Sequence, residues 1–327
     1  EVPRVHDVLG KREADSDKNR QLHDIVNARE ELLPAFTKRP VFAPLLDDAH
    51  EQKGEKHGEQ CRLNAGETRE LPIHKRLCTL IETLRNMQDW WYVETKNYII
   101  LSNLKPRFRV MIQELQVNIE AMRSFYQRVI PPAGELQGIG VVRVFNEPEE
   151  YERYVPADCR WTFGLWLPDR QELVVRRVEW GDSQDQRRMV LKAVYHEACH
   201  QYLYYAMNRQ HPAAWFNEGH ASLFENASIH DGEVTIGEDE ERLKIWREMI
   251  KGGAVNLSAL LRMSYVDFYA PDEPTRHANY TAAWALAYYL RRGAPLDKTS
   301  PYASIPDRYV EALGRLKDPD RATAAAF

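Results

Sequence analysis

The chain has 327 residues, of which 43% are hydrophobic and 10% aromatic. This is enough to form a sizeable core in one large domain with an extension, or in two domains. The formal net charge of −5 gives no basis for binding nucleic acid or an acidic membrane surface. No run approaches the roughly 18 apolar residues of a membrane-spanning helix, so we expect no membrane span.

The chain begins with Glu1 rather than Met, so we expect that a segment has been removed. One alternative is a signal peptide, which would place the protein in the periplasm or outside the cell, and the other is trimming for expression. The sequence leaves this choice and the oligomeric state open.

The four cysteines form no C-x-x-C pair, so a cysteine-based zinc site is not expected. Cys61 and Cys78 pair with each other if the protein is exported, or remain free thiols. Cys199 is expected to be a small buried hydrophobic side chain.

The N-terminal part, residues 1–92, is predicted to be a charged and partly helical extension. Residues 20–36 contain enough apolar positions for a helix, and 47–70 are polar and glycine-containing, as in a loop or linker. An apolar stripe over 71–91 predicts a further helix. The main domain is expected to cover 93–327.

The first half of the main domain is predicted to contain strands. Residues 98–101 and 138–145 are typical of strands, and Pro106 opens a long helix to about Val129. A helical turn is expected over 147–154. Residues 161–167 and 173–178 then form the two arms of a hairpin around Pro168-Asp169.

The sequence Tyr195-His196-Glu197-Ala198-Cys199-His200 contains the motif H-E-x-x-H. Two imidazoles four residues apart lie on one face of a helix, so both can reach one metal ion. Glu197 lies between them and can act on a water molecule held there. The motif therefore supplies two ligands, His196 and His200, and a catalytic base. Without a metal, the alternative is a helix with two ordinary histidines.

The residues around the motif predict a helix that begins near the capping-box pair Ser183 and Gln186. Its buried face is expected to follow steps of four and three residues. This face comprises Met189, Ala193, His196, His200, Leu203 and Met207. Pro212 suits the first turn of a second helix.

The next segment, W-x-N-E-G-x-A-S-x-x-E from Trp215 to Glu225, follows His200 closely. Together with H-E-x-x-H it resembles the gluzincin zinc metallopeptidases of the peptidase MA-like clan. The similarity extends to the segment shared by aminopeptidases and leukotriene A4 hydrolase. The resemblance implies that Glu218 is the third ligand of a Zn²⁺ ion. The 17 residues between His200 and Glu218 are one fewer than is usual in the aminopeptidases. This favours uncharacterised bacterial peptidase-MA-like proteins as the closest relatives.

Three further expectations come from the same resemblance. Tyr280, which begins Y-T-A-A-W-A-L, is similar to the tyrosine that stabilises the oxyanion in that family. One arm of the predicted hairpin is expected to be the sheet edge that pairs with an extended peptide. The G-x-M-E-N motif of aminopeptidases is absent, which favours an endopeptidase.

Other residues near these motifs have alternative interpretations. Tyr265 and Tyr269 are weaker rivals for the role of Tyr280, which is otherwise a core or rim tyrosine. Glu225 is the candidate for orienting a ligating histidine, against an ordinary exposed glutamate. Asn217 is expected to contact substrate or cap the helix. His220 is expected to face away from the metal, in a solvent-side or packing role.

The remaining residues predict a short strand and several helices. The strand is expected at 233–236, and helices at 239–250, 257–263, 276–290 and 306–316. Strands first and helices later predict an α+β, zincin-like metallopeptidase domain with a small mixed sheet, an active-site helix and a helical C-terminal half.

The function expected from the sequence is zinc-dependent hydrolysis of peptide bonds in a peptide or protein substrate. One alternative is a catalytically idle protein that uses the same scaffold to bind a peptide. The other is a zinc hydrolase that acts on a substrate other than a peptide. Glu197 argues against the idle binder, because a binder does not need this base.

Overall fold

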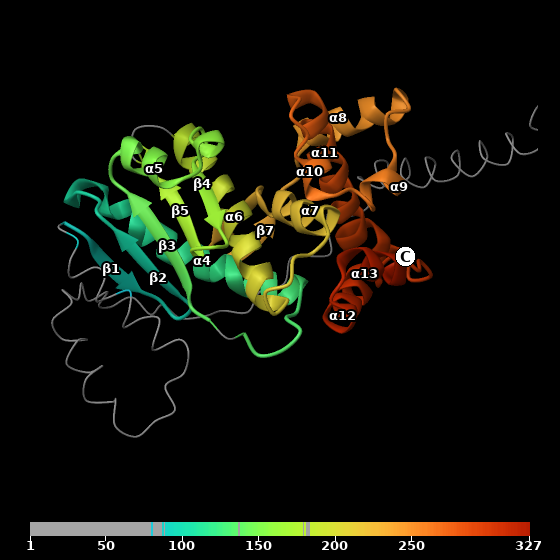
Figure 1. The fold of residues 1–327 in the computed structure, drawn as a ribbon, viewed down its shortest axis with the longest axis horizontal. Helices are drawn as coiled ribbons and strands as arrows, with labels where there is room; N and C mark the ends of the chain where they lie inside the picture. Colours follow the sequence, from blue (N-terminus) through green and yellow to red (C-terminus); the bar gives the residue numbers. More distant parts are fainter. Residues whose placement is uncertain (1–79, 81–86, 88, 137, 179, 181–183) are drawn as a thin grey trace, which may run out of the picture.

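A computed structural model describes residues 80, 87, 89–136, 138–178, 180 and 184–327. They form an α+β structure in which a small mixed sheet lies beside a helical C-terminal half (Figure 1). Helix α6 lies between these two parts, next to strand β4. None of the helices in the described segments combines the length and apolar character needed to cross a membrane.

The sheet has the strand order β1-β2-β3-β5-β4. The bounds are β1 (Trp91–Glu94), β2 (Tyr98–Ser102), β3 (Gly140–Phe145), β4 (Gly164–Leu167) and β5 (Glu172–Arg176). The central three strands are parallel, and β1 and β4 are antiparallel to their neighbours at the two edges. Strand β4 is therefore an edge strand, and it is the edge that adjoins α6.

Successive residues of the central strands point to opposite faces of the sheet. One face packs against α4 (Arg109–Val129) and α6 (Gln184–Ala206) through Tyr98, Ile100, Val142, Val144, Leu173 and Val175. On the other face, Phe145 and Val174 pack with Tyr151 of α5 (Pro148–Tyr154). The three central strands are mostly apolar and almost entirely buried because both faces are covered.

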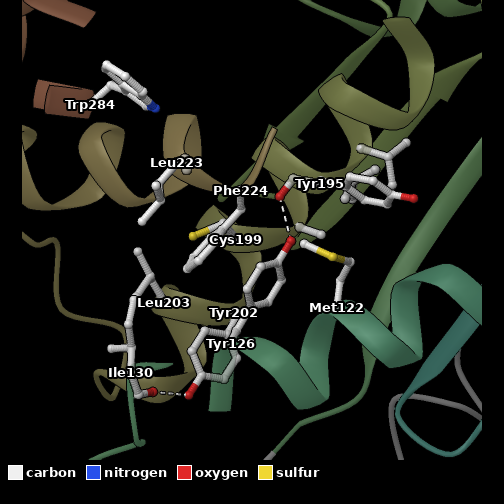
Figure 2. Packing of buried hydrophobic residues seen from close by; sticks show 14 of the residues in the cluster. Met122, Tyr126, Ile130, Tyr195, Cys199, Tyr202, Leu203, Leu223, Phe224 and Trp284 are labelled. Atoms are coloured by element: carbon white, nitrogen blue, oxygen red, sulfur yellow. Dashed lines mark hydrogen bonds between the residues drawn. The ribbon is translucent and has the colours of Figure 1, made fainter. Parts of the chain in front are cut away.

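Helix α6 is fixed against α4 by buried tyrosines (Figure 2). The Tyr126 hydroxyl donates to the Tyr195 carbonyl at 2.6 Å, and the Tyr202 hydroxyl donates to the Ile130 carbonyl at 2.5 Å. Cys199 lies in the same cluster with no exposed surface, and burial raises the pKa of its thiol well above the usual value. Cys199 is therefore an un-ionised buried side chain, as predicted. These contacts set the rotation of α6 about its axis.

The C-terminal half is built from helices and one small hairpin. After α7 (Ala214–Phe224), the elements are β6 (Ala227–His230), β7 (Glu233–Ile236), α8 (Glu240–Lys251), α9 (Leu257–Leu260), α10 (Tyr265–Phe268), α11 (Glu273–Tyr288), α12 (Ile305–Leu316) and α13 (Pro319–Ala326). Helix α7 packs along α11, and α12 packs along α13. Strand β7 also contacts α4, so the hairpin joins this half to the sheet half.

Gly219 allows α7 and α11 to approach each other closely. A Cβ atom at Gly219 would lie 2.6 Å from the carbonyl oxygen of Ala283 and 3.2 Å from the Cβ of Ala287. The obstructing oxygen belongs to the backbone, so no side-chain rotation can make room. Glycine is therefore required here by the distance between the helices.

Most predicted elements are present in the structure. The strand at 98–101, the helix after Pro106, the strand ending at Phe145 and the hairpin of β4 and β5 are confirmed. The four predicted C-terminal helices correspond to α8, α9, α11 and α12. Predictions for residues 1–79, including Cys61 and Cys78, lie outside the described residues, as does the capping residue Ser183.

Some details of the prediction are wrong. Met189 is 43% exposed, so it is not on the buried face of α6, which instead runs through Val190, Val194, Ala198, Cys199 and Tyr202. Trp91 belongs to β1 rather than to the helix that the sequence predicts over 71–91. Pro212 precedes α7, which begins at Ala214. Met189 was placed wrongly because the predicted face was centred on the histidines, which lie beside the buried stripe of α6 rather than at its centre.

We expect Gly219→Ala to destabilise the protein by about 1–3 kcal/mol, because the added methyl group forces α7 and α11 apart. Gly314, which is exposed within α12 and has open space around it, provides the matched control. Gly314→Ala should stabilise the protein by about 0.5–1 kcal/mol through the helix preference of alanine. Urea unfolding of both variants tests this, and equal effects would contradict the close approach at Gly219.

Candidate metal centre

Helix α6 presents His196 and His200 side by side. Their ring centroids are 4.6 Å apart with the ring planes at 81°. Both side chains are 12% exposed, so they are largely but not completely removed from water. The i, i+4 spacing places both Nε2 atoms toward the same neighbouring helix, α7.

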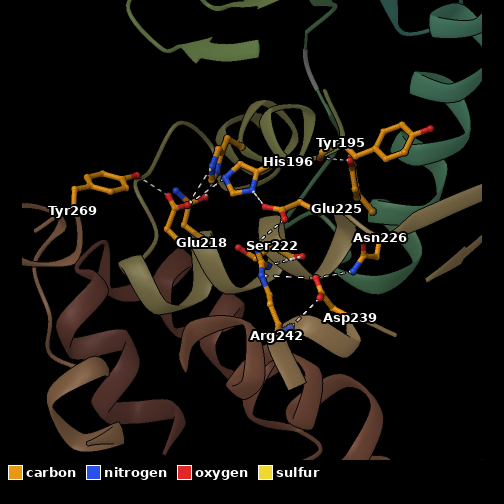
Figure 3. A network of polar contacts seen from close by, with 12 residues as sticks. Tyr195, His196, Glu218, Ser222, Glu225, Asn226, Asp239, Arg242 and Tyr269 are labelled. Atoms are coloured by element: carbon orange, nitrogen blue, oxygen red, sulfur yellow. Dashed lines mark hydrogen bonds and ion pairs between the residues drawn. The ribbon is translucent and has the colours of Figure 1, made fainter. Parts of the chain in front are cut away.

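Helix α7 brings Glu218 to these imidazoles (Figure 3). The Oε2 atom of Glu218 lies 3.3 Å from Nε2 of His196 and 3.6 Å from Nε2 of His200. One ligand atom from each residue lies within 4.8 Å of the other two. Only 1% of the Glu218 side chain is exposed, and its Oε2 atom has no hydrogen-bond partner. The structure therefore brings together all three predicted ligands.

The outer nitrogen of His196 is held by Glu225. The distance from His196 Nδ1 to Glu225 Oε1 is 2.7 Å, and Arg242 donates to the other oxygen of Glu225 at 2.8 Å. Arg242 belongs to α8, and its other terminal nitrogen donates to the Ser222 carbonyl. Helix α8 therefore holds Glu225 in place. Because the ionised carboxylate only accepts hydrogen bonds, Nδ1 of His196 is the donor. Glu225 thus occupies the orienting position that the sequence predicts.

The outer nitrogen of His200 is held by Asn217. Its Nδ1 atom lies 2.9 Å from Oδ1 of Asn217. The amide of Asn217 donates to the Tyr265 hydroxyl, which in turn donates to the Pro212 carbonyl. This chain of donors fixes the orientation of the Asn217 amide, so Nδ1 of His200 is the donor to Oδ1. The sequence did not indicate this role of Asn217.

These outer hydrogen bonds determine what the inner atoms can do. With a hydrogen on each Nδ1, the neutral imidazoles carry a lone pair on each Nε2, and both face the buried oxygen of Glu218. Three electron-rich atoms this close together require positive charge between them. The donor set of two imidazole nitrogens and one carboxylate oxygen is suited to a transition metal. The group of His196, His200 and Glu218 can therefore bind a metal ion.

The titration of the three groups shows the same demand for positive charge. Burial opposes the charge on each of them, but their mutual contacts outweigh it. Glu218 and Glu225 raise the pKa of His196 well above its ordinary value, and Glu218 raises the pKa of His200. The two imidazoles hold the pKa of Glu218 far below its usual range. The same Nε2 and Oε2 atoms can bind either a proton or a metal cation, so the two compete for this site.

Glu197 points from α6 toward the sheet edge. The backbone N–H of Trp166 in β4 donates to Glu197 Oε2 at 2.8 Å. Gly164 lies beside the same side chain, since a Cβ atom at Gly164 would lie 3.8 Å from Glu197 Cγ. The predicted base therefore lies between the histidines of α6 and the edge strand.

Two tyrosines from the C-terminal half border the centre. The ring of Tyr280 on α11 has its centroid 6.3 Å from that of His196. The Tyr269 hydroxyl, at the end of α10, donates to Glu218 Oε1 at 2.7 Å. Burial first, and then the nearby Glu218 charge, raise the pKa of both phenols, so both remain protonated. The sequence indicates Tyr269 only as a weaker rival for the role of Tyr280, and the structure shows that its hydroxyl contacts Glu218.

His220 takes no part in the centre. It is fully buried, with Nδ1 2.8 Å from the Phe216 carbonyl, and Arg291 donates to its Nε2 at 3.0 Å. Of the two roles that the sequence left open, the packing role is correct and the solvent-side role is wrong. The hydrogen bond from Arg291 ties α7 to the π-helical turn Tyr289–Gly293 after α11.

Comparison with known proteins gives one family match. Residues 190–297 match a family described as a protein of unknown function, DUF1570. The matched segment contains the three candidate ligands together with Glu197, Asn217, Glu225, Tyr265, Tyr269 and Tyr280, and it omits β4. No curated protein matches the chain.

We expect Asn217→Ala to weaken metal binding about 10- to 100-fold, because His200 loses the acceptor that orients it. Asn103→Ala is the matched control, since Asn103 also makes two hydrogen bonds, to Glu150 and from the Asn146 backbone, but not to a ligand residue. Competition with a chromophoric zinc chelator measures both affinities. Equal affinities would show that Asn217 does not support the centre.

We expect His220 to make stability depend on pH. Burial, followed by the charge of Arg291, lowers the pKa of His220 to about 3, whereas an unfolded histidine has a pKa of about 6.5. The unfolded state therefore binds this proton first, so stability present above pH 6.5 is lost as the pH falls toward 3.

In that range, the unfolding free energy of the metal-free wild type should fall by up to about 1.4 kcal/mol per pH unit more than that of His220→Gln. His230→Gln, at an exposed position of β6, should retain the wild-type slope. Identical slopes for His220→Gln and the wild type would contradict a buried neutral His220.

Proposed function

We propose that the protein is a zinc-dependent metallopeptidase of the gluzincin type that hydrolyses peptide bonds. The observation that carries this proposal is the spacing of the ligand atoms, 3.3 Å and 3.6 Å from the imidazole nitrogens to Glu218 Oε2. Tetrahedral zinc with bonds of about 2.0–2.2 Å separates its ligand atoms by about 3.3–3.6 Å. Two histidines and one glutamate also leave a fourth position open, as in catalytic rather than structural zinc sites.

The donor set favours zinc over the hard cations. Calcium and magnesium prefer shells of oxygen atoms, whereas two of the three donors here are imidazole nitrogens. When bound, zinc supplies Lewis acidity and lowers the pKa of water toward neutrality. The residues around the site then have to bind the peptide, move a proton and stabilise negative charge.

Glu197 is the candidate for moving the proton. It neighbours His196 in the chain and extends to the edge strand, where Trp166 donates to one of its oxygens. That hydrogen bond fixes the carboxylate and leaves its other oxygen to accept a proton from the attacking water. Glu197 can then deliver the proton to the leaving nitrogen of the peptide.

Tyr280 is the candidate for stabilising the oxyanion. Its phenol remains protonated because burial and then the charges of Glu218, Glu197 and Glu225 raise its pKa. A neutral phenolic donor beside His196 can donate a hydrogen bond to negative charge that develops on the carbonyl oxygen. It gains this interaction mainly in the transition state, which is when it contributes to rate.

The edge strand β4 is the candidate for binding the peptide backbone. The backbone N–H of Arg176 in β5 donates to the Phe163 carbonyl. The backbone N–H and C=O groups of Phe163, Leu165 and Leu167 therefore point toward β5. The backbone groups of the alternate residues Gly164 and Trp166 point away from β5, as the hydrogen bond from the Trp166 N–H to Glu197 shows. An extended peptide can add to such an edge by backbone hydrogen bonds.

We expect Glu197→Gln to bind zinc as tightly as the wild type but to lose at least about 100-fold in kcat, because the amide cannot accept the proton. Glu311→Gln, at an exposed position of α12, should keep full activity. The measurement is cleavage of a diverse peptide library by mass spectrometry, together with zinc content by elemental analysis.

Two different results of this experiment would each exclude part of the proposal. Bound zinc without cleavage of any peptide by the wild type would favour an idle peptide binder or a hydrolase of another substrate. Failure of the wild type to bind zinc, with His196→Ala as the blank, would exclude a zinc enzyme altogether.

A further inference from the structure

The two oxygens of the Glu218 carboxylate have different surroundings. Oε1 accepts a hydrogen bond from the Tyr269 hydroxyl at 2.7 Å (Figure 3). Oε2 has no hydrogen-bond partner, is buried, and faces both imidazoles. A carboxylate that binds a metal can use one oxygen or both, and here only one of the two is free to do so.

We propose that Tyr269 is a positioning residue for the metal centre. Its hydroxyl holds Oε1 of Glu218 away from the metal position, so that Glu218 contributes Oε2 alone and the fourth coordination position stays open. This inference rests on the proposed function, because an open position matters for a hydrolase and not for a purely structural metal site.

The short helix α10 is built to hold Tyr269 in place. Its first residue is preceded by Ser264, whose hydroxyl accepts from the Asp267 N–H and caps the helix. Phe268 is fully buried beneath it. At the other end, the Asn279 amide from α11 donates to the carbonyls of Asp267 and Phe268. A one-turn helix with both ends fixed can place a side chain accurately.

The same helix also reaches the second ligand. Tyr265, one turn before Tyr269, accepts from Asn217, which holds Nδ1 of His200. The ring centroids of Tyr265 and Tyr269 are 5.8 Å apart, so the two phenols pack against each other. Helix α10 therefore orients Glu218 directly and His200 through Asn217.

Loss of the Tyr269 hydroxyl would remove the restraint on Oε1. The Glu218 carboxylate could then turn about its terminal bond, and both oxygens could approach the metal. Coordination by both oxygens would add one ligand to a metal ion held by His196, His200 and Glu218. The affinity and the coordination number would change together, whereas a general loss of packing would change neither in a defined direction.

The test compares Tyr269→Phe with Tyr302→Phe. Tyr302 is half-buried between α11 and α12, where its ring contacts Tyr289, so the control removes a hydroxyl remote from the metal. Apo protein is titrated with Co²⁺, the visible absorption is recorded, and the dissociation constant is obtained by competition with a chelator.

For Tyr269→Phe we expect the Co²⁺ dissociation constant to rise about 10- to 100-fold, because Glu218 loses the hydrogen bond that orients it. We also expect the visible bands to lose intensity, as they do when four-coordinate cobalt gains a fifth ligand. The melting temperature of the apo protein should fall by no more than a few degrees, because Glu218 Oε1 loses a donor while the packing of the ring is kept. Tyr302→Phe should match the wild type in all three. An unchanged dissociation constant and spectrum for Tyr269→Phe would overturn the inference.

A second variant keeps the test decisive if Tyr269→Phe does not fold. Asn279→Ala removes the restraint on the end of α10 without touching a ligand residue, and it should alter the Co²⁺ spectrum in the same direction. An unaltered spectrum would count against the inference. Wild-type protein that binds Co²⁺ but cleaves no peptide would overturn the proposed function alone, since the Tyr269 comparison needs only the metal.

Discussion

A buried carboxylate oxygen faces two imidazole nitrogens, and this contact determines how the surrounding structure is organised. Glu218 Oε2 is almost completely removed from water and has no hydrogen-bond donor of its own. An ionised oxygen in such a position is costly unless a positive charge compensates it. The neighbouring groups do not contact this oxygen. Glu225 and Asn217 accept hydrogen bonds from the Nδ1 atoms of the histidines, and Tyr269 donates to the other oxygen of Glu218.

The elements that carry these groups come from three parts of the chain. Helix α6 is held by buried tyrosine contacts with α4, so His196 and His200 are fixed relative to the sheet (Figure 2). Helix α7 carries Glu218 and packs on α11, which carries Tyr280. Helices α8 and α10 add Arg242 and Tyr269 from outside (Figure 3). The centre thus lies where the sheet half and the helical half meet.

The sequence predicted the parts of the centre that depend on local spacing. His196, Glu197 and His200 lie within one or two turns of a helix, so helical spacing was enough to find them. Glu218 and Glu225 came instead from the resemblance of the segment Trp215–Glu225 to a known family. Short runs of apolar residues also predicted the central strands, and Pro168-Asp169 between two such runs predicted the hairpin of β4 and β5.

The contacts made across long stretches of chain were not predictable in this way. The hydrogen bonds from Tyr269 to Glu218 and from Trp166 to Glu197 join residues 51 and 31 positions apart. They depend on how helices and strands pack, which periodicity does not encode. One local signal was available: Ser264 and Asp267 have capping spacing, and Tyr265 and Tyr269 follow at positions one helical turn apart. The wrong prediction for Met189 has the same cause, because packing against α4 and the sheet determines which residues of α6 are buried.

The close approach at Gly219 limits how this part of the protein can vary in evolution. The atom that excludes a larger residue is the Ala283 carbonyl oxygen, which every amino acid at that position would also carry. A change on α11 therefore cannot compensate for a change at Gly219, and the two positions cannot drift as a pair. Gly219, beside Glu218, should persist wherever these two helices meet at this distance, even where His196, His200 and Glu218 have been lost.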